Sequence, residues 1–182
     1  MKNDFVAKHL NVEAFARGAG KLAGEERLAR FDRLLEETLG LGAETPVSYL
    51  VRGEVVREGE SSEEIWLHLE VQVVLPLTCQ RCLGPVEVPV LAERSFRFVA
   101  TEELASAQDE EAEEDVLVLS REFNLLELME DELLMALPVV PKHEVCPVPV
   151  KLQVADPDFV DEPVEKPNPF AVLGQLKKPP AS

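Results

Sequence analysis

Apolar and polar residues alternate along three consecutive stretches of the chain. In the clearest stretch every second residue is apolar, at Ile65, Leu67, Leu69, Val71, Val73 and Leu75. Shorter runs of the same period occupy residues 49–55 and 86–98, and Arg94 interrupts the latter. A period of two indicates strands with one buried face, so we expect an antiparallel meander, with a bend or an exposed stretch at Arg94. A short fourth strand is expected over residues 116–119.

Two other segments have apolar residues at helical spacing. In residues 25–39 the apolar positions are Leu28, Phe31, Leu35 and Leu39, and Gly40 follows as a stop signal. After Asn124 one helical face carries Leu125, Leu128, Met129, Leu133, Ala136 and Leu137, and Pro138 ends the segment. Asn124 and Glu127 predict a capping box, in which the Asn124 side chain accepts from the backbone N–H of Glu127.

These elements predict an α+β fold, in which an antiparallel sheet of three to four main strands is packed by a helix over 125–137. We expect an N-terminal helical segment over 1–45, an α+β core over 46–146, and a proline-rich linker and tail over 147–182. Residues 101–115 hold eight acidic side chains and no basic one, which predicts an acidic loop within the core domain. Residues 147–169 contain six prolines, which favours an extended linker.

The tail carries a compact apolar cluster followed by two lysines. Its members are Phe170, Val172, Leu173 and Leu176. A short motif reached through a linker is typical of a docking element that binds a partner. The alternative is that this cluster packs against the protein's own sheet, because an exposed apolar cluster is a liability.

The composition is that of an ordinary globular protein that remains inside the cell. The 182 residues are 46% hydrophobic, which is enough for one core, and no stretch has the length of a signal sequence or a membrane span. We therefore expect a cytoplasmic protein with no membrane partner. Three cysteines make a disulfide framework improbable, which leaves reduced thiols or a metal site.

The net charge of −17 disfavours a protein that coats nucleic acid, because that binding relies on lysine and arginine. The charge is unevenly distributed: residues 1–99 carry 12 basic and 16 acidic side chains, whereas residues 100–182 carry 6 and 19. An acidic C-terminal half attracts basic proteins. The alternative is that the acidic residues provide solubility alone.

The cysteines and one histidine predict a candidate zinc site. Cys79 and Cys82 lie where a hairpin should turn, and His143 and Cys146 follow the second predicted helix. Together the two pairs form a complete tetrahedral ligand set if the end of the helix folds back over the hairpin. A metal-free remnant and a redox pair remain alternatives, although reactive C-x2-C pairs usually lie at a helix N-terminus.

Three blocks of the sequence together resemble a known family. They are Leu77-Thr-Cys-Gln-Arg-Cys-Leu-Gly-Pro85, residues 124–146 and residues 166–177. With these blocks the chain resembles the YceD family, the bacterial large ribosomal RNA subunit accumulation proteins, from about residue 47 to residue 178. The resemblance implies a role in the synthesis, processing or stability of 23S ribosomal RNA. Some family members have more cysteines after the helix, where this chain has one histidine and one cysteine.

The resemblance favours a non-enzymatic factor whose partner is a ribosomal protein, an assembly factor or a pre-ribosomal particle, with ribosomal RNA bound directly or indirectly. The alternative is direct RNA binding by sheet residues, for which the candidates are Arg52, Arg81, Arg94, Arg97 and Trp66. A zinc- or thiol-dependent activity at the C-x2-C pair is a minor alternative. No catalytic residues are predicted, because neither a phosphate-binding glycine loop nor a nucleophile motif is present.

Overall fold

The structure is a computed structural model that describes residues 5–58, 62–109 and 112–149, together with residues 154, 156, 158 and 170. The chain divides into two units, Met1–Pro149 and Val150–Ser182. Every helix and strand of the described residues belongs to the first unit, so the N-terminal segment and the sheet share one unit. None of the described helices has the length and apolar character needed to cross a membrane.

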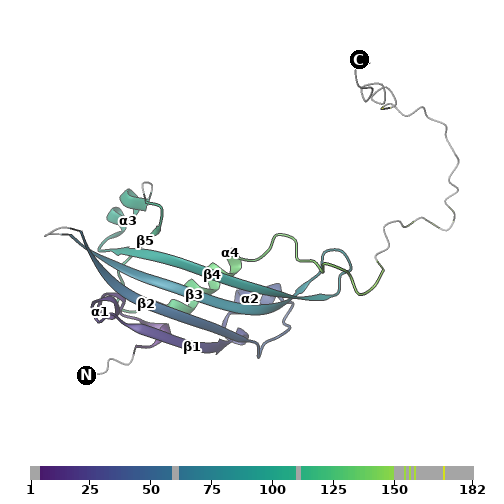
Figure 1. The fold of residues 1–182 in the computed structure, drawn as a ribbon, viewed down its shortest axis with the longest axis horizontal. Coiled ribbons are helices and arrows are strands. Elements are labelled where there is room, and N and C mark those ends of the chain that lie inside the picture. The colour runs from purple at the N-terminus through teal and green to yellow at the C-terminus, as the bar shows by residue number, and fades with distance from the viewer. Residues whose placement is uncertain are drawn as a thin grey trace, which may run out of the picture. The chain divides into compact units, whose positions relative to one another are not determined.

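A five-stranded sheet forms the centre of the first unit, in the order β1-β2-β3-β4-β5 (Figure 1). The strands are β1 Lys21–Arg27, β2 Pro46–Glu58, β3 Ser62–Thr78, β4 Pro85–Val99 and β5 Asp115–Val118. The first four pair antiparallel, which confirms the predicted meander and the α+β fold class. The short strand β5 pairs parallel to β4, and β1 is an additional strand that the sequence pattern did not predict.

The described helices are α1 Val12–Arg17, α2 Asp32–Glu37, α3 Glu102–Asp109 and α4 Leu125–Met135, with short 3₁₀ turns at Ala7–His9 and Leu28–Arg30. Figure 1 shows α2 and α4 behind the sheet, whereas α3 lies at the β5 edge. Helix α4 packs against β3 and β4, and α1 packs against β2 and β3. The alternating apolar residues of β3 are therefore buried under helices, and the polar residues between them form an open face.

Helix α1 approaches the sheet closely because β2 has a glycine beneath it. A Cβ atom at Gly53 would lie 2.7 Å from the Phe15 ring and 2.8 Å from the Cα of Ala16. Phe15 is fully buried at this contact. Glycine is thus the residue that lets α1 and the Phe15 ring rest directly on the strand.

Helix α4 begins where the sequence predicts, but its cap differs in one donor. The side-chain oxygen of Asn124 accepts from the backbone N–H of Leu126 at 3.2 Å, so the predicted bond from Glu127 is corrected. The buried residues include Leu125, Met129 and Leu133, as expected, and also Leu126.

A buried carboxylate joins α4 to α2. Oε1 of Glu130 accepts from the backbone N–H groups of Arg33 and Leu34 at 2.8 and 3.2 Å, and Oε2 accepts from the Arg33 guanidinium at 2.9 Å. The side chain of Phe31, which precedes α2, makes no cap bond. Glu130 therefore satisfies the backbone donors at the start of α2 from a helix about 97 residues away in sequence.

The expectation of a helix over 25–39 was wrong in its N-terminal part. Residues up to Arg27 belong to strand β1, and α2 covers six residues. Leu39 and Gly40 both have positive φ, so the chain leaves the helix before Leu39, which is exposed. In residues 25–27, pairing with β2 outweighs local helix propensity. This pairing places Glu26 opposite Val47, on the side of the sheet that the helices cover.

The expectation of an acidic loop over 101–115 is also corrected in part. Residues 102–109 form helix α3, and the backbone N–H of Ala105 bonds to the Thr101 carbonyl at 3.0 Å. Ala105 is the buried residue of this helix. Two acidic side chains in the first turn stabilise α3 through their interaction with the positive end of the helix dipole. The sequence prediction relied on the number of apolar residues and did not include this interaction.

Truncation of Leu133 to alanine should lower the free energy of unfolding by about 2–5 kcal/mol, because Leu133 is fully buried beneath the sheet. Met135 is on the same helix and is 68% exposed, so Met135→Ala should change stability by less than about 0.5 kcal/mol. Urea unfolding of both variants measures the difference. Equal losses for the two variants would contradict this packing.

Candidate functional site

The four predicted metal ligands converge at the end of the sheet where β3 and β4 are joined. Cys79 follows β3 directly, Cys82 lies in the turn, and His143 and Cys146 belong to the segment after α4. One ligand atom from each of the four residues lies within 4.8 Å of the other three. Cys79 is buried and the other three residues are half-buried.

Two of the distances between the ligand atoms are close to those of a tetrahedral metal site, and none of the six exceeds 4.8 Å. Sγ of Cys79 is 4.0 Å from Sγ of Cys146, and Sγ of Cys82 is 3.5 Å from Nδ1 of His143. Zinc bonds of about 2.3 Å to sulfur and about 2.0 Å to nitrogen, at tetrahedral angles, place sulfurs about 3.8 Å apart and a sulfur about 3.5 Å from a nitrogen. The residues present therefore fit a single zinc-sized ion.

Backbone hydrogen bonds shape the turn that carries the cysteine pair. The N–H of Leu83 donates to the Cys79 carbonyl and the N–H of Cys79 donates to the Gly84 carbonyl, each at 2.8 Å. Leu83 has a φ of 58°, in the left-handed region. This tight turn directs both cysteine side chains toward the segment that follows α4.

Two further contacts hold that segment against the turn. The N–H of Gln80 donates to the Pro141 carbonyl at 2.8 Å. The Arg81 guanidinium donates to the carbonyls of His143 and Glu144, the latter at 3.0 Å. Arg81, predicted as a candidate RNA contact, thus bonds the backbone beside the ligand cluster.

The cluster favours a thiolate at Cys79. Burial acts to raise the pKa of this thiol, but hydrogen bonds from the backbone N–H groups of Cys82, His143 and Arg81 outweigh burial and lower the pKa to about 5. Burial and hydrogen bonds with the other two cysteines raise the pKa of Cys146. Because Cys79 is fully buried, a substrate has no direct access to its thiolate, which disfavours thiol catalysis.

Two of the predicted RNA-binding arginines already have acidic partners. Arg94 bonds Asp115 at 2.6 Å and lies 3.4 Å from Glu132 of α4. Arg97 bonds Glu114 at 2.6 Å. β4 continues through Arg94 without a break, so the predicted bend is wrong, whereas residues 93–95 are all exposed, which agrees with the alternative of an exposed stretch.

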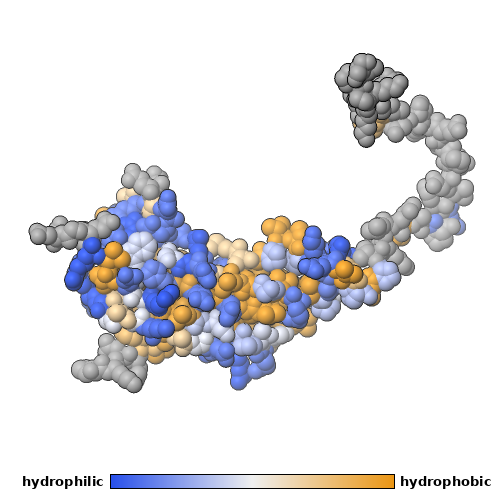
Figure 2. All heavy atoms as spheres, in the orientation of Figure 1, coloured by the Kyte–Doolittle hydropathy of each residue, from blue (hydrophilic) through white to orange (hydrophobic). Residues whose placement is uncertain are grey.

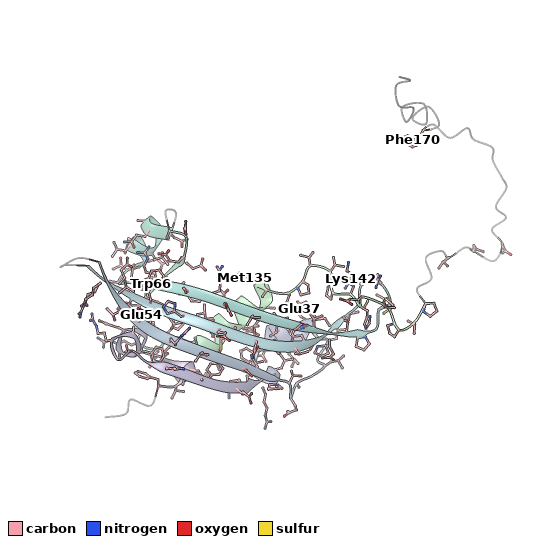
Figure 3. The ribbon with its side chains drawn as sticks, in the orientation of Figure 1. Glu37, Glu54, Trp66, Met135, Lys142 and Phe170 are labelled. Atoms are coloured by element: carbon pink, nitrogen blue, oxygen red, sulfur yellow. The ribbon has the colours of Figure 1, made fainter. Side chains whose placement is uncertain are left out.

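Trp66 also has protein partners on the open face. Its ring stacks on His68 with centroids 6.3 Å apart and planes 9° apart, and its Nε1 donates to Glu64. Glu54 lies across from it in the register of β2 and β3, as Figure 3 shows. The tryptophan is half-buried among these neighbours, so it offers less free ring surface than the sequence suggested.

Arg52 has a basic neighbour that sequence reasoning missed. Lys21 of β1 is its direct register partner on the open face. A groove of about 880 Å³ is lined by both residues and by Arg17, Arg57 and His68. The pairing depends on β1, a strand that was not predicted and whose last three residues were assigned to a helix, so no signal within residues 17–30 alone could have revealed it.

An opposed pair of acids lies farther along the same face. Glu70 of β3 and Glu93 of β4 are exposed direct register partners. Val74 and Leu91, 46% and 53% exposed, lie beyond them on this face. Figure 2 shows exposed apolar side chains along the middle of the sheet and near the end of α4.

The predicted tail motif lies almost entirely outside the described residues. Phe170 is described and is 70% exposed. Val172, Leu173 and Leu176 lie outside the described residues. The tail therefore stays a prediction from the sequence.

Comparison with known protein families shows to which family this chain is related. The family model described as large ribosomal RNA subunit accumulation protein YceD matches residues 67–177, which is more than half of the chain.

The chain belongs to the YceD family. A protein of Haemophilus influenzae named "Large ribosomal RNA subunit accumulation protein YceD" is 38% identical over 111 residues, which is 60% of this chain and 63% of that protein. The match thus spans just under two thirds of the relative's length. No solved structure matches this chain. The YceD match contains all four residues of the Cys/His cluster and the Glu70–Glu93 pair, whereas Lys21 and Arg52 precede it.

Replacement of Arg97 by alanine should lower the free energy of unfolding by about 1–3 kcal/mol, because its side chain is 14% exposed and its guanidinium bonds Glu114 and Gln108. Arg52→Ala should change stability by less than about 0.5 kcal/mol, since Arg52 is exposed. Urea unfolding compares the two variants. If Arg97→Ala left the free energy of unfolding unchanged, the arginine would not be structural and would again be a candidate for RNA binding.

Proposed function

We propose that this protein is a non-enzymatic ribosome-biogenesis factor that supports the synthesis, processing or stability of large-subunit ribosomal RNA. The observation that carries the proposal is the YceD match over residues 67–177 and the name of the H. influenzae relative. The match covers most of β3, all of β4 and β5, and α4, the main helix that covers the sheet. The cytoplasm, where bacterial ribosomes assemble, is the proposed location.

The proposed mode of action is binding of a basic ribosomal protein or assembly factor. The acidic second half of the chain supports this, because its net charge attracts a cationic partner. Exposed acids of α3, among them Glu102, Glu103 and Asp109, lie near the β5 edge of the sheet.

The acid pair on the open face supports the same mode. Like charges directly opposite each other in a sheet are destabilising. Glu70 and Glu93 nevertheless face each other within the family match, beside the exposed side chains of Val74 and Leu91. A lysine or arginine of a partner placed between the two carboxylates would relieve the repulsion, and the apolar neighbours would supply buried area. The predicted tail motif at Phe170 is a second contact in this mode.

Direct RNA binding is the second candidate, and the opposed pair of Lys21 and Arg52 favours it. Two cations side by side in a groove with Arg17 and Arg57 form a site for phosphate groups in a chain whose overall charge is strongly negative. Arg17 and Arg57 both bond Glu63, which lowers the free positive charge of the groove. The basic residues of this groove precede the family match, so the groove has less support than the acid pair.

Deletion of the gene in its native host should lower the amount of large-subunit ribosomal RNA relative to small-subunit ribosomal RNA. The full-length chain supplied in trans should restore the ratio, because the proposal assigns the effect to this protein. Quantification of both RNAs by gel or hybridisation measures it. An unchanged ratio, with the deletion verified, would sink the proposed function.

Two double variants separate the partner classes. Glu70→Gln with Glu93→Gln should reduce recovery of a ribosomal or assembly protein at least about tenfold from lysate at physiological salt, and the wild-type interaction should survive nuclease. Lys21→Gln with Arg52→Gln removes an equal number of charges from the same face and should leave that recovery intact.

The pattern expected for direct RNA binding is the reverse. All partners would then be lost with nuclease, the Lys21/Arg52 variant would be the defective one, and affinity would fall steeply with salt. Both double variants should remain folded, because each relieves a repulsion between exposed side chains.

A further inference from the structure

We propose that Cys79, Cys82, His143 and Cys146 bind one Zn²⁺ ion in a closed, tetrahedral structural site, and that this ion fastens the segment after α4 to the β3–β4 turn. The proposal rests on the convergence of four ligand atoms within 4.8 Å and on the weak packing of the segment that carries two of them. It is independent of the role in ribosome biogenesis.

The donor set selects the metal. Three cysteine sulfurs and one imidazole nitrogen at tetrahedral spacing suit zinc, whereas Mg²⁺ and Ca²⁺ require oxygen ligands. Four protein ligands also fill the coordination sphere, which is typical of structural zinc and leaves no position for a reacting water. The ion would therefore hold parts of the fold together and not catalyse a reaction.

The neighbourhood of the cluster balances the charge of such a site. One Zn²⁺ ion with three thiolates and a neutral imidazole carries a net charge of −1. The Arg81 guanidinium bonds the carbonyls of His143 and Glu144 beside the ligands and supplies one positive charge. These bonds also fix the backbone that carries His143, as outer partners of metal sites commonly do.

Apart from the hydrogen bonds of Gln80 and Arg81, the segment that contributes His143 and Cys146 has little packing to hold it in place. Residues 138–149 form no helix or strand, and none of them is buried. Val139 is 97% exposed and Val145 is 86% exposed, so its apolar side chains do not anchor it. Its half-buried residues are Pro141 and the two ligands themselves.

Contacts without a metal do not account for this burial. Thiols are weak hydrogen-bond donors, and the Cys79–Cys146 sulfur separation of 4.0 Å is about twice that of a disulfide. A metal ion supplies the missing free energy, because structural zinc sites stabilise small segments strongly. The ion would thereby fix the backbone up to Cys146, close to the start of the second unit at Val150.

Metal analysis of the purified full-length chain, prepared without chelators, tests the proposal. Elemental mass spectrometry should detect one zinc ion per chain. Replacement by Co²⁺ should produce the visible bands of tetrahedral cobalt and a thiolate-to-metal charge-transfer band. A chain that contains no stoichiometric zinc and takes up neither Zn²⁺ nor Co²⁺ would overturn the proposal, as would a stoichiometric metal other than zinc.

Ligand variants assign the site to these residues. Cys82→Ser and His143→Ala, one from each segment, should each lower zinc content at least about fivefold. His9→Ala is the control, because His9 is exposed on a 3₁₀ turn and is not one of the four ligands. Full zinc content in both ligand variants would place the metal elsewhere and refute the assignment.

The fastening role has its own readout in the wild-type chain. Removal of the ion by a chelator should speed hydrogen exchange at the amide of Gln80, which bonds the Pro141 carbonyl, by at least about tenfold. Exchange at Val71, in the centre of the sheet, should stay unchanged because its burial does not involve the cluster. Unchanged exchange at both amides after verified zinc removal would refute the fastening role.

Discussion

The long apolar face of β3 is the constraint on which the rest of this structure depends. Every second residue from Ile65 to Leu77 is buried on one side of the strand. A sheet with one such face needs a cover, and α4 with α1 provides it. The other face is left open, and the two like-charge pairs considered for binding, Glu70–Glu93 and Lys21–Arg52, lie on it. The direction of burial in β3 thus decides both where the core forms and where partners have access.

The sequence-based prediction succeeded where the hydrophobic periodicity was clear and turn or capping residues marked the boundaries. β2, β3, β4 and α4 have clear periodicity, and Gly84 and Pro85 mark the turn between β3 and β4, so their order and pairing followed from local pattern. It failed at β1 and α3, where local preference does not decide the structure. β1 is a strand because β2 offers an edge to pair with, and α3 forms beside β5 although Ala105 is its one buried residue.

The candidate metal cluster could be predicted because ligand types and spacing are visible in a sequence. Its position relative to α4 required the fold, since 61 residues separate Cys82 from His143. The binding roles of the arginines could not be read in the same way. Whether an arginine is available to bind a partner depends on which acid lies opposite it. Arg94 pairs with Asp115 of β5 and Glu132 of α4, and Arg97 pairs with Glu114, which directly precedes β5.

Both edges of the sheet are poor templates for a further strand. β5 pairs over four residues, and β1 places the charged Glu26 on the side of the sheet that the helices cover. Short edges and inward-directed charges are devices that discourage edge-to-edge association and aggregation. A peptide segment would gain little by extending this sheet, so recognition by the protein has to proceed through side-chain surfaces.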